Sequence, residues 1–559
     1  MRSVSVRQAQ VSIEQSCGEA IGGESVGREA LPRSTLLLCS RIMNGPPAKM
    51  DTSNATKRFL LLNTSLWLGF LVALGTALRL FRLGARSLWL DEAISAMLAR
   101  IDRHTFVSAV VHRQANMVLY YVLLRGWIRL GSSEFALRSL SVVAGVAAIP
   151  AIYLLGKRLF GGRAGRVAAL LLCVHAFHIR YSQEGRSYSL VMLLAVLSSL
   201  FFLRCLEEPS RWNWAAYIAF STLMVYAQVF GGWVLVAQWS SLFLPLFFKR
   251  SEFRCPIHGK QFFFSAAAIC FLIAPLAYCL LFVSDRSQLA WLAKPSMQDL
   301  YKFCLDLTGN GGTILLLVYL ALVLAALAAV IMGRRSAPDS GQLWKHFFLL
   351  LWLILPPLLL LVISLRWPAF EPRFLIICIP PLLLLAANGL SRVRSKILFS
   401  AALMIALALS VAGVDYYYRG RVDDRYTDDW RDATHYILSQ AEPGDAIVFT
   451  YSEEKLAFDE YQSRFHGENA PLDKYPDETD AELLTRGPSR LSDQSLDGII
   501  VRCRRVSVIS AFQPDRLSRQ VEAKLGVHFS SHRNFAFGFV RVDLFADPIA
   551  GSAIDQSIP

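Results

Sequence analysis

Long apolar runs alternate with short polar loops over most of the chain. After Lys57 and Arg58, residues 59–78 contain no charge. Twenty such residues, rising 1.5 Å each in a helix, cross a bilayer core of about 30 Å. Ten more apolar runs follow, so the pattern predicts a membrane protein of about eleven helical spans. The ten runs are 139–155, 165–179, 188–203, 214–230, 232–248, 262–283, 313–332, 347–365, 374–390 and 397–414.

Loop charge predicts the orientation of these spans. With the N-terminus in the cytoplasm, the inside loops contain 16 Lys and Arg and the short outside loops seven. Basic residues favour the cytoplasmic side of a membrane. We therefore expect a multi-pass protein of the cytoplasmic membrane with its N-terminus inside and its C-terminal part outside. Within the long outside segment 79–138, Arg125 and Arg129 share one face of an otherwise apolar helix, which predicts an interfacial helix.

The polar ends of the chain define the remaining domains. Residues 1–57 are expected to be a disordered cytoplasmic tail, or an overlong start whose true beginning is Met43 or Met50. Residues 58–414 form the predicted transmembrane domain, 415–545 a small outer α/β domain, and 546–559 a flexible tail. The fold class is thus mainly α, with a small C-terminal sheet. In the outer domain we expect a helix from Asp429 to Gln440 and strands at 446–451, 498–501 and 537–544.

Composition excludes other classes of protein. A chain that is 54% hydrophobic and 18% charged is too apolar to be a soluble protein of this size. The net charge of +14 would suit nucleic acid, but the basic residues lie mostly in loops between apolar runs, where they set topology. We expect contact with membrane lipid and no nucleic-acid partner.

An acidic pair, Asp91-Glu92, follows the first apolar run closely. An unpaired carboxylate buried near the membrane costs several kcal/mol, so its presence indicates a function. In one interpretation Asp91 only caps a helix over 92–100, with Glu92 in the first turn. In the other, Asp91 is a catalytic base; the two are compatible, because a cap leaves one carboxylate oxygen free.

Two further polar clusters fall on the same predicted outer face. The first, 178–188, contains Arg180, Gln183, Glu184 and Arg186, and the second, 366–374, contains Arg373. Both could be interfacial anchors. Arginine also suits a lipid phosphate, because it stays charged and binds phosphate oxygens with two parallel hydrogen bonds.

A carboxylate and arginines together provide what sugar transfer needs. The base takes the proton of an acceptor hydroxyl, and the cations offset the charge of a leaving phosphate. There is no Gly-rich phosphate loop for a nucleotide sugar, which favours a lipid-carried donor. There is also no clear metal-ligand spacing, so no metal and no cofactor is predicted.

Several of these segments resemble a known family. The chain is similar to the polyprenyl-phosphate-sugar-dependent glycosyltransferases of the GT-C superfamily, in the branch with protein O-mannosyltransferases and the lipid A aminoarabinose transferase. The similar segments are 88–92, 119–121, 133–140, 154–161, 181–186, 372–374, 429–431 and 443–445.

The resemblance implies a helical bundle, an inverting reaction and site residues. It makes Asp91 the general base, assisted by Glu92, and it makes Arg186 and Arg373 contacts of the donor phosphate. Many members read His-Pro-Pro-Leu-Tyr-Tyr where this chain has Asn116 in an altered stretch, and Phe374 stands where tyrosine is frequent. The substrate-binding residues that it implies are Asn116, Tyr120, Tyr181, Gln183 and Glu184.

The sequence thus predicts an integral-membrane glycosyltransferase. Its donor is a polyprenyl-phosphate sugar, and its acceptor is an unidentified protein, lipid or polysaccharide. The alternative is a transporter or flippase of a lipid-linked glycan, which would also need charged residues but should show internal repeats and polar groups at the membrane midplane. A sensor with a binding outer domain is a third interpretation, and it leaves Asp91 and Glu92 without a role.

Overall fold

The computed structural model describes residues 52–243, 259–285, 294–333, 340–422, 428–465, 472–487, 493–511 and 516–549. The chain divides into two units, Met1–Leu66 and Trp67–Pro559, and every contact reported below lies within the second. The two predicted tails, 1–57 and 546–559, fall mostly outside the described residues.

Membrane-spanning helices dominate the second unit. Among the described residues, seven helical segments are long and apolar enough to cross a membrane, which makes the chain a multi-pass membrane protein. The end of α3 (Thr52–Leu80) adds a shorter apolar helix over Thr64–Leu80. The seven segments are α7 (Glu134–Phe160), α10 (Tyr188–Glu207), α13 (Gly259–Tyr278) with η6 (Cys279–Val283), α15 (Gly312–Gly333), α16 (Ser340–Arg366), η8 (Pro372–Cys378) with α17 (Ile379–Ser391), and α18 (Lys396–Val422).

The predicted count of about eleven spans is not confirmed. Three of the predicted spans form shorter helices in the described part of the chain: α8 (Gly162–Cys173), α11 (Arg211–Ala227) and α12 (Gly232–Ser241). A helix of 12 residues such as α8 is about 18 Å long, well short of a bilayer core of about 30 Å. In the described part of the chain these three helices are therefore not among the seven segments that are long enough to cross a membrane.

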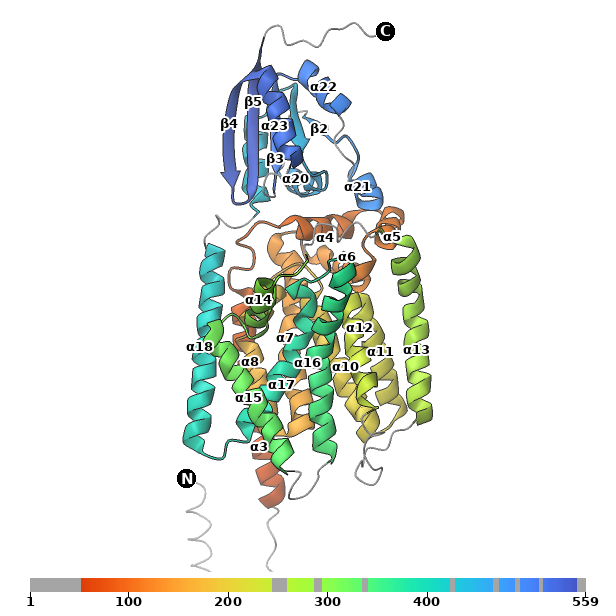
Figure 1. Cartoon of the computed structure of the whole chain (residues 1–559), viewed down its shortest axis with the longest axis vertical. Helices are drawn as coiled ribbons and strands as arrows, with labels where there is room; N and C mark the ends of the chain where they lie inside the picture. The colour runs from red at the N-terminus through yellow and green to blue at the C-terminus, as the bar shows by residue number, and fades with distance from the viewer. Residues whose placement is uncertain are drawn as a thin grey trace, which may run out of the picture. The chain divides into compact units, whose positions relative to one another are not determined.

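The centre of the bundle forms around α17. In the span Pro372–Ser391, 94% of the apolar window is buried, against 11% for Gly259–Val283, so α17 is an interior helix and α13 presents its apolar surface outward. Helices α7 and α8 both pack against α17 (Figure 1). Where α7 meets α8, a Cβ on Gly156 would lie 2.9 Å from the Cα of Gly165. Small residues at this crossing allow the backbones to approach closely, as is common between membrane helices.

The first outer loop contains short helices that precede α7. They are α4 (Leu90–Arg100), α5 (Arg103–His112), η1 (Ala115–Met117), α6 (Val118–Trp127) and η2 (Ile128–Leu130). Helix α6 corresponds to the interfacial helix that the pattern of Arg125 and its apolar neighbours predicts. The loop is not isolated, because α4 packs against α20 (Glu454–Gln462) and α5 against α21 (Asp480–Arg486) of the C-terminal domain.

The C-terminal domain is a five-stranded mixed sheet with helices, as Figure 1 shows. The strand order is β2-β1-β3-β5-β4, in which β1 pairs in parallel with β2 and β3, while β5 pairs antiparallel with β3 and β4. The strands are β1 (Asp445–Phe449), β2 (Asp473–Tyr475), β3 (Arg505–Ser510), β4 (Phe529–Phe537) and β5 (Val540–Pro548). The remaining helices of the domain are α19 (Trp430–Gln440), α22 (Asp493–Arg502) and α23 (Arg516–His528).

The C-terminal domain contains the predicted helix and the first predicted strand. Helix α19 begins one residue after Asp429, whose side chain caps it by accepting a hydrogen bond from the Asp432 N–H. Strand β1 is buried throughout, as predicted for 446–451. The strand predicted at 498–501 was wrong, because these residues lie within α22. The buried residues Leu496, Ile499, Ile500 and Cys503 recur every three or four positions, which is the period of a helix.

Candidate active site

Asp91 lies in the first turn of α4. The helix begins at Leu90, and the residue at the N-cap position is Trp89, which makes no capping hydrogen bond with its side chain. Asp91 therefore does not cap this helix, and the interpretation of Asp91 as an N-cap is wrong. A carboxylate in the first turn is stabilised by the helix dipole. The Asp91 side chain is 30% exposed, so it remains accessible to a substrate.

Arg186 lies against Asp91 from the loop between α9 (Ala176–Ser182) and α10. Its Nη2 atom lies 3.6 Å from Oδ2 of Asp91. Its Nη1 atom donates to the Asp91 carbonyl oxygen at 3.3 Å, to Ser95 Oγ at 3.2 Å and to the Tyr121 hydroxyl at 3.1 Å. The guanidinium is thus fixed by the first outer loop and cannot turn freely toward lipid.

Arg373 approaches the same oxygen from η8. Its Nη1 atom lies 3.7 Å from Oδ2 of Asp91, and its Nε lies 3.5 Å from Oε1 of Glu371. The guanidinium also lies over the Trp89 ring, 5.2 Å from the ring centre, which is a favourable cation–π distance. Three segments far apart in sequence therefore meet at one carboxylate oxygen.

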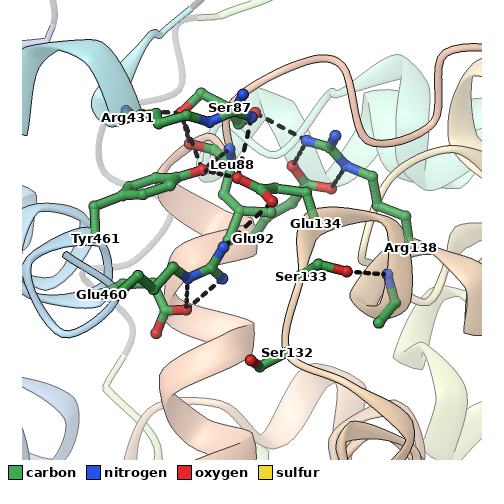
Figure 2. A network of polar contacts seen from close by, with 12 residues as sticks. Ser87, Leu88, Glu92, Ser132, Ser133, Glu134, Arg138, Arg431, Glu460 and Tyr461 are labelled. Carbon is green, nitrogen blue, oxygen red and sulfur yellow. Dashed lines mark hydrogen bonds and ion pairs between the residues drawn. The ribbon is translucent and has the colours of Figure 1, made fainter. Parts of the chain in front are cut away.

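Glu92, the next residue, forms a buried ion pair. Arg138 of α7 donates to its two oxygens at 2.8 Å and 2.6 Å, and the Gly185 N–H donates to Oε1 at 2.6 Å (Figure 2 shows the pair with Arg138). Burial raises the pKa of Glu92, but the Arg138 charge and these hydrogen bonds outweigh burial and hold the pKa below its usual value. Glu92 thus joins α4 to α7 and to the loop that carries Arg186.

Three of the predicted substrate-binding residues make hydrogen bonds to the protein itself. Asn116 Oδ1 accepts from the Val229 N–H at 3.2 Å, and the Tyr120 hydroxyl lies 2.9 Å from Ser141 Oγ. The Gln183 amide donates to the carbonyl oxygens of Arg79 and Phe81. Asn116 and Gln183 thus hold backbone groups directly, and Tyr120 bonds Ser141, whose hydroxyl donates to the Arg186 carbonyl oxygen.

Tyr181 and Glu184 are placed differently. The Tyr181 ring packs edge-on against Tyr188 with ring centres 5.0 Å apart. Glu184 Oε1 lies 3.5 Å from Nε of Arg180, while its buried Oε2 has no hydrogen-bond partner among the described residues. Burial raises the pKa of Glu184. An unsatisfied buried carboxylate oxygen is costly and marks Glu184 as a group that a bound molecule can satisfy.

The chain is similar to known proteins in part of its sequence and in its fold. Residues 115–278 match the model of the dolichyl-phosphate-mannose-protein mannosyltransferase family. A search of curated proteins finds no match. Among solved structures, ArnT from Cupriavidus metallidurans bound to undecaprenyl phosphate matches at 13% identity and a TM-score of 0.56, covering 88% of this chain and 99% of that one. The apo form matches at 12% identity and 0.57, covering 87% and 100%. The chain has the fold of ArnT.

At this level of identity the likeness to ArnT shows the fold, and it confirms the predicted mainly helical membrane bundle with a small C-terminal sheet. A weaker match is the archaeal oligosaccharyltransferase AglB from Archaeoglobus fulgidus in complex with an inhibitory peptide and a dolichol-phosphate. It has 12% identity and a TM-score of 0.48, and the match covers 81% of this chain and 69% of that one.

Sequence reasoning missed several residues that build the site of this ArnT-like chain. Trp89 and Tyr121 lie within segments that resemble the family. The sequence does not show that Trp89 contacts Arg373 or that Tyr121 accepts a hydrogen bond from Arg186. Arg138 also lies in such a segment. Tyr461, in the C-terminal domain, hydrogen-bonds the residues just before α4, and no local pattern connects it to them. Among the described residues, no three His, Cys, Asp or Glu side chains gather as a metal site would require.

Proposed function

We propose that this chain is an integral-membrane glycosyltransferase that moves a sugar from a polyprenyl-phosphate carrier to an acceptor hydroxyl. The observation that carries the proposal is the placement of Asp91. Its partly exposed carboxylate lies between Arg186 and Arg373 in a chain with the fold of ArnT. This arrangement combines a base with two cations at one point.

The proposed reaction is a single displacement. The acceptor oxygen attacks the anomeric carbon while Asp91 takes the hydroxyl proton, and the bond from that carbon to the phosphate oxygen breaks. The acceptor attacks from the face opposite the phosphate, which leaves with the bonding electron pair, so the configuration at the sugar inverts. Both ion pairs of Asp91 involve Oδ2, which leaves Oδ1 to accept the proton. A general base of this kind contributes about 10²- to 10⁴-fold to the rate.

Arg186 and Arg373 are the proposed contacts of the donor phosphate. Negative charge on the phosphate grows as it leaves, so fixed guanidinium groups stabilise the transition state more than the bound donor. Undecaprenyl phosphate is bound in one of the ArnT structures that resemble this chain, which favours a lipid phosphate of the same class here. Ion-pair distances of 3.6 Å and 3.7 Å are longer than direct hydrogen bonds, so the Asp91 carboxylate holds neither guanidinium tightly.

The other predicted site residues divide into two groups in this proposal. Glu184 offers its unsatisfied Oε2 to a sugar hydroxyl, and Tyr181 forms the neighbouring wall. Asn116 and Gln183 act through the backbone that they hold, and Tyr120 acts through Ser141, which bonds the Arg186 carbonyl oxygen. Glu92 acts by positioning Asp91 and the Arg186 loop. We place the reaction at the outer face of the cytoplasmic membrane, as loop charge favours. The acceptor is a protein, lipid or polysaccharide.

A transporter or flippase fits the structure less well. Such a protein would hold its charged residues near the midplane, in broken helices. Here Asp91, Arg186 and Arg373 lie at the starts of helices or in the loops that precede them. This position suits chemistry at one membrane surface.

The test is sugar transfer by the purified protein. Undecaprenyl phosphate carrying labelled hexose, pentose or aminopentose is mixed with the protein and with envelope material from a strain lacking it. The proposal predicts that label moves from the lipid to an acceptor, with release of undecaprenyl phosphate. Movement of intact donor across proteoliposomes without release would favour the transporter instead.

A further inference from the structure

The segment that leads into α4 is held by the C-terminal domain through one hydroxyl group. We propose that Tyr461 of α20 is a positioning residue, which fixes the start of α4 and thereby sets the place of Asp91. The inference rests on the proposed function, because it concerns the carboxylate that acts in transfer.

The Tyr461 hydroxyl makes three hydrogen bonds, shown in Figure 2. It accepts from the Leu88 N–H at 2.7 Å and from Ser87 Oγ at 3.2 Å, and it donates to Oε1 of Glu134 at 3.0 Å. A phenol has one proton and two lone pairs, so all of its hydrogen-bonding capacity is used. Tyr461 is 1% exposed and Leu88 is fully buried, so water does not readily replace these bonds.

These bonds act where α4 needs support. The N-terminal N–H groups of a helix have no partner within the helix and usually receive one from a capping side chain. Trp89, at the N-cap of α4, provides no such bond. Two residues before the helix begins, the Leu88 N–H is fixed by Tyr461, and the Ser87 hydroxyl accepts from the Arg431 N–H of α19 at 3.1 Å. The C-terminal domain thus holds the segment that leads into α4 and does not cap the helix itself.

The opposite side of the same segment is held by the membrane domain. Arg138 donates to the Ser87 carbonyl oxygen at 2.9 Å and pairs with Glu92. Asp91 lies between these two attachments, one from α7 and one from α20. Loss of the Tyr461 hydroxyl would free one side of the segment and leave the Leu88 N–H unpaired, so the Asp91 carboxylate would no longer be held at a fixed distance from Arg186.

Packing of the Tyr461 ring is separable from the role of its hydroxyl. The ring stacks on Phe465, with ring centres 6.4 Å apart, and the Arg464 guanidinium lies over it at 5.1 Å. Phenylalanine preserves both contacts, so Tyr461→Phe removes the hydrogen bonds and keeps the packing. Tyr436→Phe is the matched control, because the Tyr436 ring packs against Phe535 and Phe537 of β4 in the same domain.

The test measures transfer kinetics and amide hydrogen exchange on the full-length protein. In Tyr461→Phe we expect turnover to fall by about ten- to a hundred-fold, since small misplacements of a catalytic group have effects of this size. The KM for the donor should change little, because Arg186 and Arg373 are intact. Amides of 87–92 should exchange faster than in the wild type. Tyr436→Phe should match the wild type in all three measurements.

Two results would overturn the inference. One is wild-type turnover in Tyr461→Phe, and the other is faster exchange throughout the C-terminal domain with no specific change at 87–92, which would indicate a general loss of stability. If the wild type transfers no sugar, the proposed function fails. The exchange data then still decide whether Tyr461 holds the segment, because faster exchange confined to 87–92 supports this role and unchanged exchange contradicts it.

Discussion

The guanidinium of Arg186 lies 3.6 Å from the carboxylate of Asp91, a residue 95 positions earlier in the chain. The same guanidinium donates to the Asp91 carbonyl oxygen and to the Tyr121 hydroxyl, so its position is fixed before any substrate binds. Preorganised charge of this kind stabilises a transition state without reorganisation during the reaction. The contact between Arg186 and Asp91 therefore places a fixed positive charge beside the proposed catalytic base.

Arginine and lysine should not be interchangeable at the donor phosphate. Arg186→Lys and Arg373→Lys keep the charge but lose the planar pair of donors that binds phosphate oxygens. We expect turnover and apparent donor affinity each to fall by about tenfold or more, measured as steady-state transfer against donor concentration. The matched control is Arg366→Lys, an exposed arginine before η8 whose guanidinium lies over Trp367. If both site variants behave like this control, the arginines are interfacial anchors and not phosphate contacts.

Glu92→Gln should affect stability more directly than chemistry. Removal of one partner from a buried ion pair leaves the Arg138 charge uncompensated, which costs about 3–5 kcal/mol. We expect a clearly lower unfolding temperature in detergent than for the wild type. A wild-type unfolding temperature in Glu92→Gln would show that the charge pair is not what stabilises this region.

The same pair predicts how stability depends on pH. Because the pKa of Glu92 is lowered in the folded protein, its contribution is fully present above the usual carboxyl pKa and is lost as the pH falls through the lowered value. Thermal unfolding of the wild type should therefore become easier in acid, and Glu92→Gln should show a weaker acid dependence. Parallel pH profiles for the two proteins would contradict this assignment.

The predicted orientation can be tested by labelling in intact cells. Ser439 at the end of α19 and Ser395 between α17 and α18 are both exposed. A membrane-impermeant thiol reagent should label Ser439→Cys and should not label Ser395→Cys until the cells are opened, each compared with the parent protein. The reverse pattern would place Asp91 and its arginines on the cytoplasmic side.

Much of the site follows from the sequence for a physical reason. Charged residues near a lipid core are costly, so Asp91, Arg186 and Arg373 stand out against their apolar surroundings. The structure brings these three residues together from three segments. The mainly helical membrane fold was likewise predictable, because spanning helices need long uncharged runs.

Other features depend on tertiary contacts that local patterns do not contain. Gln183 and Asn116 are predicted substrate-binding residues, and only the folded chain shows that their side chains bond backbone groups of neighbouring segments. The short apolar run at 498–501 is compatible with a strand or a helix, and together with its flanking residues it forms helix α22. Tyr461 lies 373 residues from the Leu88 N–H that it binds, and only the folded chain relates them.

The assignment of Asp91 as the base is tested most directly by Asp91→Asn. Asparagine keeps the size of the side chain but cannot accept a proton at neutral pH, so transfer from undecaprenyl-phosphate sugar should fall by at least about a hundredfold while the protein still inserts and binds the donor. Asp102→Asn is the control in the same loop, where the side chain only caps α5 and asparagine caps equally well. Near-wild-type turnover in Asp91→Asn would contradict the account.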